Sequence, residues 1–161
     1  MGYQWWKFVH VLGVFAFLLS HGVSVGVAVR LRRERDPLKV LTLVQLSGSS
    51  IAAFYVSLLL LVGAGVALGF LGHWWSYVWI WAAIAVLVAT MGLMYALARP
   101  YFRKIRVVAG AMAQGSQAVT TEQFADLLTS STLFVVMAIG VVGLGLILWL
   151  MIMQPHPFGT F

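Results

Sequence analysis

Residues 5–29 read WWKFVHVLGVFAFLLSHGVSVGVAV, an apolar run that ends before Arg30. At about 1.5 Å of rise per residue, a helix of this length crosses a bilayer core of about 30 Å. Two histidines, His10 and His21, lie inside the run. Because ionisable residues within a membrane span are costly and rare, the stretch predicts a spanning helix that carries a functional site.

The composition of the whole chain favours a membrane protein. Of its 161 residues, 62% are hydrophobic and 9% are charged, whereas charged residues make up about 25% of a typical soluble domain. The apolar segments long enough to span a bilayer cover about residues 5–29, 45–71, 75–98 and 132–153. We therefore expect an all-α fold in which residues 1–161 form a single integral membrane four-helix bundle in the lipid bilayer.

Basic residues gather in residues 30–44 and 99–131, the two segments that join the spans on one side. Under the positive-inside rule these segments are cytoplasmic loops, which places both termini outside the cell inner or plasma membrane. The seven tryptophans agree, since all fall at or near the predicted outer ends. The net charge of +6 then reflects membrane topology, and the chain has no folded basic module of the kind that binds nucleic acid.

Local motifs predict helix boundaries within the expected loops. Asp36-Pro37 is a plausible helix start that would extend the second span backwards, and Thr120-Thr121-Glu122-Gln123 is typical of a helix N-terminus. Residues 101–113 either continue the third helix beyond the bilayer or lie on its surface. For the small polar patch of Gln45 and residues 47–50, we expect hydrogen bonds between helices, with a ligand contact as the alternative.

Two glycine pairs have the G-x-x-x-G spacing that permits close helix approach: Gly22 with Gly26, and Gly65 with Gly69. The spacing is compatible with packing inside one protomer. It is equally compatible with a homo-oligomer or a larger membrane complex.

The histidines near the outer face are candidate ligands for haem b, because imidazole is a common axial ligand of haem iron. His10 lies near the outer surface, and His73 in the outer hairpin and His156 after the fourth span lie at or above its level. A bis-histidine haem would pair His10 with His73 or with His156. The alternative is that His73 and His156 are ordinary interfacial residues.

His21 lies deeper than the other histidines. It is about 16 Å along the helix from His10 and within about 20° of the same face. Counting inward from the outer boundaries places Met91 and Met137 at its depth, and a methionine thioether is a known axial haem ligand. The other interpretations are a hydrogen bond from His21 to a serine or a backbone carbonyl, and five-coordinate haem ligation.

A second constellation suits copper. Met151, Met153 and His156 lie at the outer end of the fourth span. Thioether and imidazole ligands favour Cu(I), so this cluster is an alternative site for copper handling at the outer face.

The motif Trp5-Trp6-Lys7-x-x-His10-Val11, followed by an apolar helix and a basic loop, resembles the first helix of a group of small bacterial membrane proteins. The group includes the membrane domain of copper-resistance protein D, the four-helix protoporphyrinogen oxidase that binds haem b, and uncharacterised relatives of similar size. The resemblance implies that His10 is a haem or metal ligand. Residues 127–132 lack the Asn-Glu-Pro pattern of the oxidase, so the uncharacterised relatives are the better match.

Three functions follow as hypotheses. The first is a haem-b-binding membrane protein that transfers electrons or handles haem; the second is a non-catalytic membrane subunit or anchor of a larger complex; the third is copper handling at the outer face. Cysteine is absent and all four acidic residues fall in the expected loops. This distribution argues against hydrolysis by an activated nucleophile within the membrane.

Overall fold

The computed structural model describes residues 2–116 and 118–155, and every regular element within them is a helix. The elements are α1 (Gly2–Leu31), α2 (Pro37–Leu71), the 3₁₀ turn η1 (Trp74–Ser76), α3 (Val78–Ala113), α4 (Thr121–Thr129) and α5 (Ser131–Met153). Four helical stretches are long and apolar enough to cross a membrane. The expected all-α, four-helix fold is therefore confirmed, and the protein is built as a multi-pass membrane protein.

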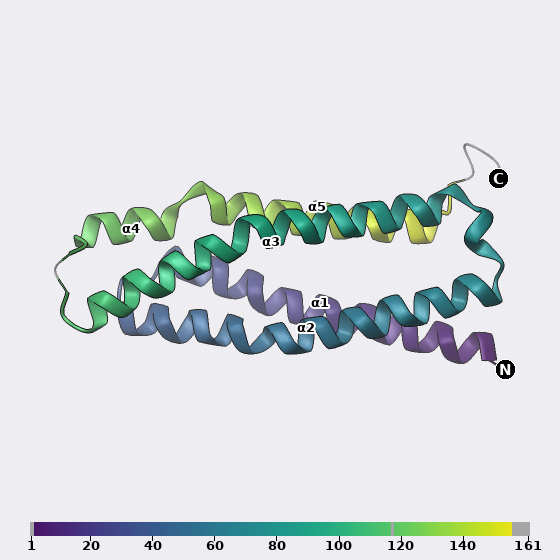
Figure 1. Cartoon of the computed structure of the whole chain (residues 1–161), viewed down its shortest axis with the longest axis horizontal. Helices are drawn as coiled ribbons and strands as arrows, with labels where there is room; N and C mark the ends of the chain where they lie inside the picture. Colours follow the sequence, from purple (N-terminus) through teal and green to yellow (C-terminus); the bar gives the residue numbers. More distant parts are fainter. Residues whose placement is uncertain (1, 117, 156–161) are drawn as a thin grey trace.

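The long helices form two antiparallel pairs, α1 with α2 and α3 with α5 (Figure 1). The end of the bundle where α1 begins and α5 ends also holds the turn between α2 and α3; we call it the tryptophan end. The opposite end, where α1 passes into α2 and where α4 lies, is called the basic end. The tryptophan end carries Trp5, Trp6, Trp74, Trp75, Trp79, Trp81 and Trp149.

Glycines set the closest approach within each pair. A Cβ atom on Gly13 would lie 2.9 Å from the Leu61 Cα, so α1 and α2 touch backbone to backbone there. In the other pair, a Cβ atom on Gly143 would lie 2.3 Å from the Thr90 hydroxyl oxygen. No larger residue fits at either position without movement of the neighbouring helix or side chain.

Two helices are much longer than a bilayer requires. α2 has 35 residues and α3 has 36, and at 1.5 Å per residue each exceeds about 50 Å, against about 30 Å for the bilayer core. The excess lies at the basic end, where α1 to α5 all contribute to one well-packed cluster. Its buried members are Val27, Ala28, Leu31, Val40, Val44, Tyr101, Ile105, Ala109, Phe124, Leu128 and Leu133.

Most of residues 30–44 and 99–131, expected as connecting loops, are helical. The expected helix start at Asp36-Pro37 is confirmed, and of the two alternatives for residues 101–113 the structure has the continued third helix. α2 begins at Pro37, where Asp36 caps it by accepting a hydrogen bond of 2.9 Å from the Leu38 amide. α3 continues through Pro100. A proline inside a helix costs about 3 kcal/mol, and burial of the face containing Tyr101 and Ile105 offsets that cost.

The predicted helix start at Thr120 is confirmed. The Thr120 hydroxyl accepts from the Gln123 amide at 3.2 Å, and the Gln123 side chain accepts from the Thr120 amide at 3.1 Å. Residues 47–50 were expected to form hydrogen bonds between helices. This expectation is wrong for the hydroxyls of Ser49 and Ser50, which bond within their own helix. Ser49 and Ser50 donate to carbonyls of their own helix, at Leu46 and Ser47, since a serine in a helix easily reaches the preceding turn.

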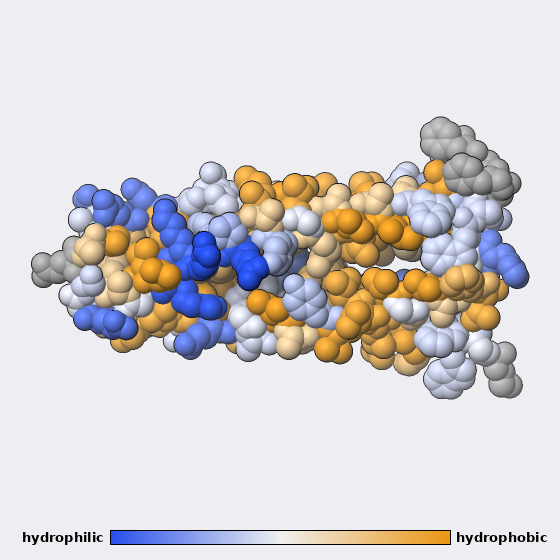
Figure 2. Space-filling model, in the orientation of Figure 1, coloured by the Kyte–Doolittle hydropathy of each residue, from blue (hydrophilic) through white to orange (hydrophobic). Residues whose placement is uncertain are grey.

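Apolar side chains cover most of the half of the molecule toward the tryptophan end, and hydrophilic residues gather toward the basic end (Figure 2). Large exposed residues of this apolar half include Leu19, Leu59, Val88 and Val142. Such a surface is suited to a lipid bilayer rather than to water.

Candidate functional site

His10 lies at the contact between α1 and α2. Its Nδ1 atom is 2.9 Å from the backbone carbonyl oxygen of Leu61. Because a carbonyl can only accept, Nδ1 carries the proton, which leaves Nε2 of a neutral ring as the atom able to bind a metal. Gly65 makes room for the ring, since a Cβ atom there would lie 3.2 Å from the His10 Cε1.

His21 is buried, with 7% of its surface exposed. Among the residues that the structure describes, its Nε2 atom has no hydrogen-bond partner. The ring lies against Gly140 of α5, where a Cβ atom would be 2.8 Å from both Cε1 and Nε2 of the ring. Nε2 therefore does not form the hydrogen bond to a serine or a carbonyl that the sequence led us to consider.

The methionine beside His21 is Met94 of α3. Its sulfur lies 3.4 Å from the Cβ position of Gly140, the same point that the His21 ring approaches. Counting along the sequence gave Met91 because the third helix was expected to start at Trp75. The turn η1 moves the start of α3 to Val78, and the same count then reaches Met94.

The two histidines of α1 share one face but contact different helices. Gly13 and Phe17, which lie between them at helical spacing, are buried on that face. His10 bonds to α2, whereas His21 packs against α5. The site at His21 therefore joins the two helix pairs, and the site at His10 lies within one of them.

His73 is not brought to His10. It is an exposed residue in the left-handed conformation, with φ of 55°, just after the end of α2. The His10 ring lies against Gly65. From there α2 continues for six residues to its end at Leu71, about 9 Å of helix rise, and His73 follows beyond that end. His156, the other expected partner, lies outside the described residues.

The methionines of the expected copper cluster diverge. Met151 is half-buried, whereas Met153 is 62% exposed. Within residues 2–116 and 118–155, no group of three or more His, Cys, Asp or Glu side chains could hold a metal ion.

Aromatic packing explains one of the glycine pairs. The Trp75 ring covers Gly69, where a Cβ atom would lie 2.8 Å from it, and the Trp81 indole donates to the Trp75 carbonyl at 3.0 Å. Gly65 and Gly69 thus make room for side chains, those of His10 and Trp75. A Cβ atom on Gly22 or Gly26 would have nothing within 4 Å.

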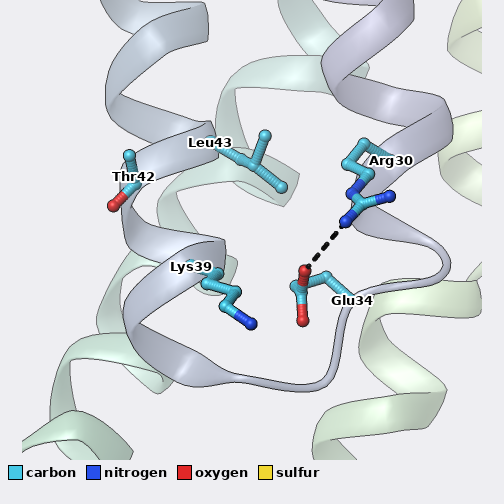
Figure 3. A pocket seen from close by; sticks show the side chains of 5 residues that line it. All are labelled: Arg30, Glu34, Lys39, Thr42 and Leu43. Atoms are coloured by element: carbon cyan, nitrogen blue, oxygen red, sulfur yellow. Dashed lines mark ion pairs between the residues drawn. The ribbon is translucent and has the colours of Figure 1, made fainter.

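A shallow pocket of about 260 Å³ lies at the basic end, between the end of α1 and the start of α2 (Figure 3). Arg30 and Glu34 form an ion pair across it at 3.8 Å. Hydrogen bonds from the Arg35 and Asp36 amides to Glu34 lower the pKa of its carboxyl group. The remaining lining residues are Lys39, Thr42 and Leu43, so the pocket contains no histidine and is separate from both histidine sites.

No protein-family model, curated protein or solved structure matches this chain. Function is therefore inferred from the chain's own residues. The sequence did not predict four of the groups found beside the histidines: the Leu61 carbonyl, Gly65, Met94 and Gly140. The glycine spacing pointed to Gly65, and a corrected helix start would have pointed to Met94.

Proposed function

We propose that this protein binds haem b within the membrane and transfers electrons or handles haem, with His10 as an axial ligand. The observation that carries the proposal is the hydrogen bond from His10 Nδ1 to the Leu61 carbonyl. Histidines that ligate metals commonly donate their other ring N–H to a carbonyl or a carboxylate, which fixes the tautomer and orients the ligating nitrogen.

The fit to haem differs between the two histidines of α1. The His10 ring is half-buried, and among the described residues its hydrogen bond is made through Nδ1, with none found for Nε2. His21 Nε2 faces the backbone of α5 at Gly140, where a macrocycle would not fit. A narrow gap separates the two helix pairs in the apolar half (Figure 2), which favours accommodation of a flat apolar group there. Bound haem would supply one-electron redox chemistry.

For the second axial position we propose His156. His73 is the other histidine that the sequence offers, but about 9 Å of α2 lies between the level of His10 and the end of the helix that precedes His73. We further propose that the basic end faces the cytoplasm and that both termini lie outside the inner or plasma membrane. Arg30, Arg99 and Arg103 lie toward the basic end, as the positive-inside rule requires.

The absorption spectrum of purified protein tests the haem proposal. The chain is expressed in cells with ample haem, purified in detergent, and measured oxidised and dithionite-reduced. We expect a Soret band that sharpens on reduction, and a pyridine haemochrome of haem b. Purified, folded protein without a Soret band would overturn the proposal.

A membrane subunit or anchor is the second candidate, and the basic end favours it. α2 and α3 are longer than a bilayer core requires, and α1 to α5 share a core at the basic end. Among the described residues, the exposed cations Arg33, Arg103 and Lys104 have no ion-pair partner. This function predicts a stable complex without cofactor that R103E/K104E disrupts and K7E, at the tryptophan end, leaves intact. A haem-bearing protein that purifies alone as a monomer would contradict it.

A further inference from the structure

We propose that the arginines on one face of α3 bind the phosphate of an anionic phospholipid, in the leaflet at the basic end. These residues are Arg99, Arg103 and Arg106, which we call the arginine face. At 3.6 residues per turn they lie within about 60° of one another around the helix, and they extend over about 10 Å along it. All three side chains are exposed. The proposal rests on the membrane-spanning fold and involves neither histidine site.

The charges of the arginine face are not balanced by the described residues. Within residues 2–116 and 118–155, Arg103 and Arg106 make no ion pair and no hydrogen bond. Arg99 donates to the neutral hydroxyl of Tyr95. The carboxylates that form ion pairs in this part of the chain engage cations at the end of α1 and the start of α2 instead. The arginine face is therefore available to an anion.

The side chains of the arginine face point back toward the apolar half. Helical side chains lean toward the N-terminus of their helix, and α3 begins at the tryptophan end (Figure 1). Arg99 follows this rule, since it bonds to Tyr95 one turn closer to the tryptophan end and lies 5.1 Å from the centre of that ring. Arg106 reaches α2, where its Nη2 atom would lie 3.7 Å from a Cβ atom on Gly48. Gly48 belongs to the apolar segment expected to span the bilayer, residues 45–71.

The arginine face lies at the level of the lipid headgroups. A bilayer core of about 30 Å within a total of about 40–45 Å leaves a headgroup layer of about 5–8 Å on each side. The third apolar segment ends at Ala98, so Arg99 stands at the start of this layer. Figure 2 shows strongly hydrophilic residues where the apolar half gives way to the basic end. Because the side chains lean toward the bilayer, their guanidinium groups fall in the layer that holds the phosphates.

The chemistry of the surface fits a phospholipid better than a free phosphate. Guanidinium groups bind phosphate oxygens with paired hydrogen bonds. On α2, Gln45 lies about 60° from Gly48 around the helix; its amide is exposed and has no hydrogen bond among the described residues. Toward the tryptophan end, the face of α3 that carries the arginines continues with Val88, which is 65% exposed. A phosphate can thus contact the arginines while an acyl chain lies along the apolar part of the same face.

Native mass spectrometry of the purified, delipidated chain in detergent tests the site. Phosphatidylglycerol is the anionic probe and phosphatidylcholine is the matched lipid without net charge. We expect saturable binding of one phosphatidylglycerol, with about tenfold preference over phosphatidylcholine, and no displacement by an equal concentration of inorganic phosphate. Equal binding of the two lipids would overturn the proposal. Displacement by inorganic phosphate would contradict the assignment to a lipid.

Two charge-matched double variants locate the binding. R103Q/R106Q should weaken phosphatidylglycerol binding about tenfold or more, because each cation near the headgroups contributes to the attraction. The control R33Q/K104Q removes two other exposed charges from the basic end, and Lys104 lies about 160° from Arg106 around α3. This control should bind as the unmodified chain does. An equal loss in both variants, or unchanged binding in R103Q/R106Q, would contradict the site.

A third variant separates phosphate recognition from charge alone. R103K/R106K keeps both positive charges and therefore the charge asymmetry that orients the helices. Lysine is a point charge and cannot form the paired hydrogen bonds of a guanidinium. We expect binding of phosphatidylglycerol to fall between that of the unmodified chain and that of R103Q/R106Q. Full affinity in R103K/R106K would show that net charge is sufficient and would contradict a site built on the arginines.

Discussion

The imidazole of His10 donates a hydrogen bond of 2.9 Å to the main-chain carbonyl of Leu61, which lies one turn from Gly65 on α2. A Cβ atom at Gly65 would lie 3.2 Å from the His10 Cε1, closer than an ordinary contact, so the ring would have to shift to admit it. The hydrogen bond thus fixes the tautomer and the orientation of the histidine, and no hydrogen bond of Nε2 is found in residues 2–116 and 118–155. This arrangement links the glycine pattern of α2 to the proposed ligand on α1.

Substitution of Gly65 tests this link. In G65A the new Cβ atom would lie 3.2 Å from the His10 ring and lengthen the bond to Leu61. The control is G63A, where a Cβ atom would have nothing within 4 Å. This variant measures only the stabilisation that replacing glycine with alanine gives to a helix. We expect G65A to be less stable than G63A by about 1 kcal/mol, the net value of one hydrogen bond, in thermal or denaturant unfolding in detergent. Equal stability of the two variants would mean that the ring does not need the space.

The packing of His21 against α5 makes a second prediction. A Cβ atom at Gly140 would lie 2.8 Å from the His21 ring, and overpacking of this kind costs about 1–3 kcal/mol. G140A should therefore unfold more easily than G145A, where the added atom meets nothing within 4 Å. In the background H21A the penalty of G140A should shrink. If G140A destabilised the H21A background as much as the unmodified chain, the His21 ring would not be the cause of the destabilisation.

At the basic end, Tyr101 of α3 forms a hydrogen bond to α4, the short helix that precedes α5. Its hydroxyl donates to the Leu127 carbonyl at 2.9 Å, and its side chain is buried. Y101F should destabilise the protein by about 1 kcal/mol, measured by unfolding. The control Y55F changes an exposed tyrosine and should have little effect, so equal losses from the two variants would contradict the role given to Tyr101.

The connection between α1 and α2 should respond to acid. The Arg35 and Asp36 amides hold the pKa of Glu34 below its ordinary value. The stabilisation from Glu34 is then fully present above the ordinary carboxyl pKa, and it is lost as the pH falls through the lowered pKa. E34Q should therefore unfold more easily than the unmodified chain at pH 7, and this difference should shrink on acidification below about pH 4. A difference that does not change with pH would exclude the carboxylate as its source.

The membrane helices were predictable because their signal is length and composition. The apolar runs located all four spans, and the expectation of histidines on one face of the first helix agrees with the burial of Gly13 and Phe17 between them. The basic end was less predictable. Helix α3 passes through Pro100 because Tyr101 and Ile105 pack against other helices, and such tertiary contacts cannot be read from local sequence.

The neighbours of the candidate ligands were the least predictable feature. Counting residues inward from the expected start of the third helix placed Met91 at the depth of His21. The count was three residues off because the η1 turn moves the start of α3 to Val78. The Leu61 carbonyl has no sequence signature, since every residue carries one. A glycine shows only that space is available, and the fold decides that His10 fills it at Gly65 and His21 at Gly140.

The most direct test of the central claim compares haem content in two histidine variants. H10L and H73A are purified from the same cells as the unmodified chain, and the reduced-minus-oxidised spectra are normalised to protein. We predict that H10L loses most of its haem b absorbance and that H73A keeps it. A normal haem content in folded H10L would contradict the assignment of His10 as the axial ligand.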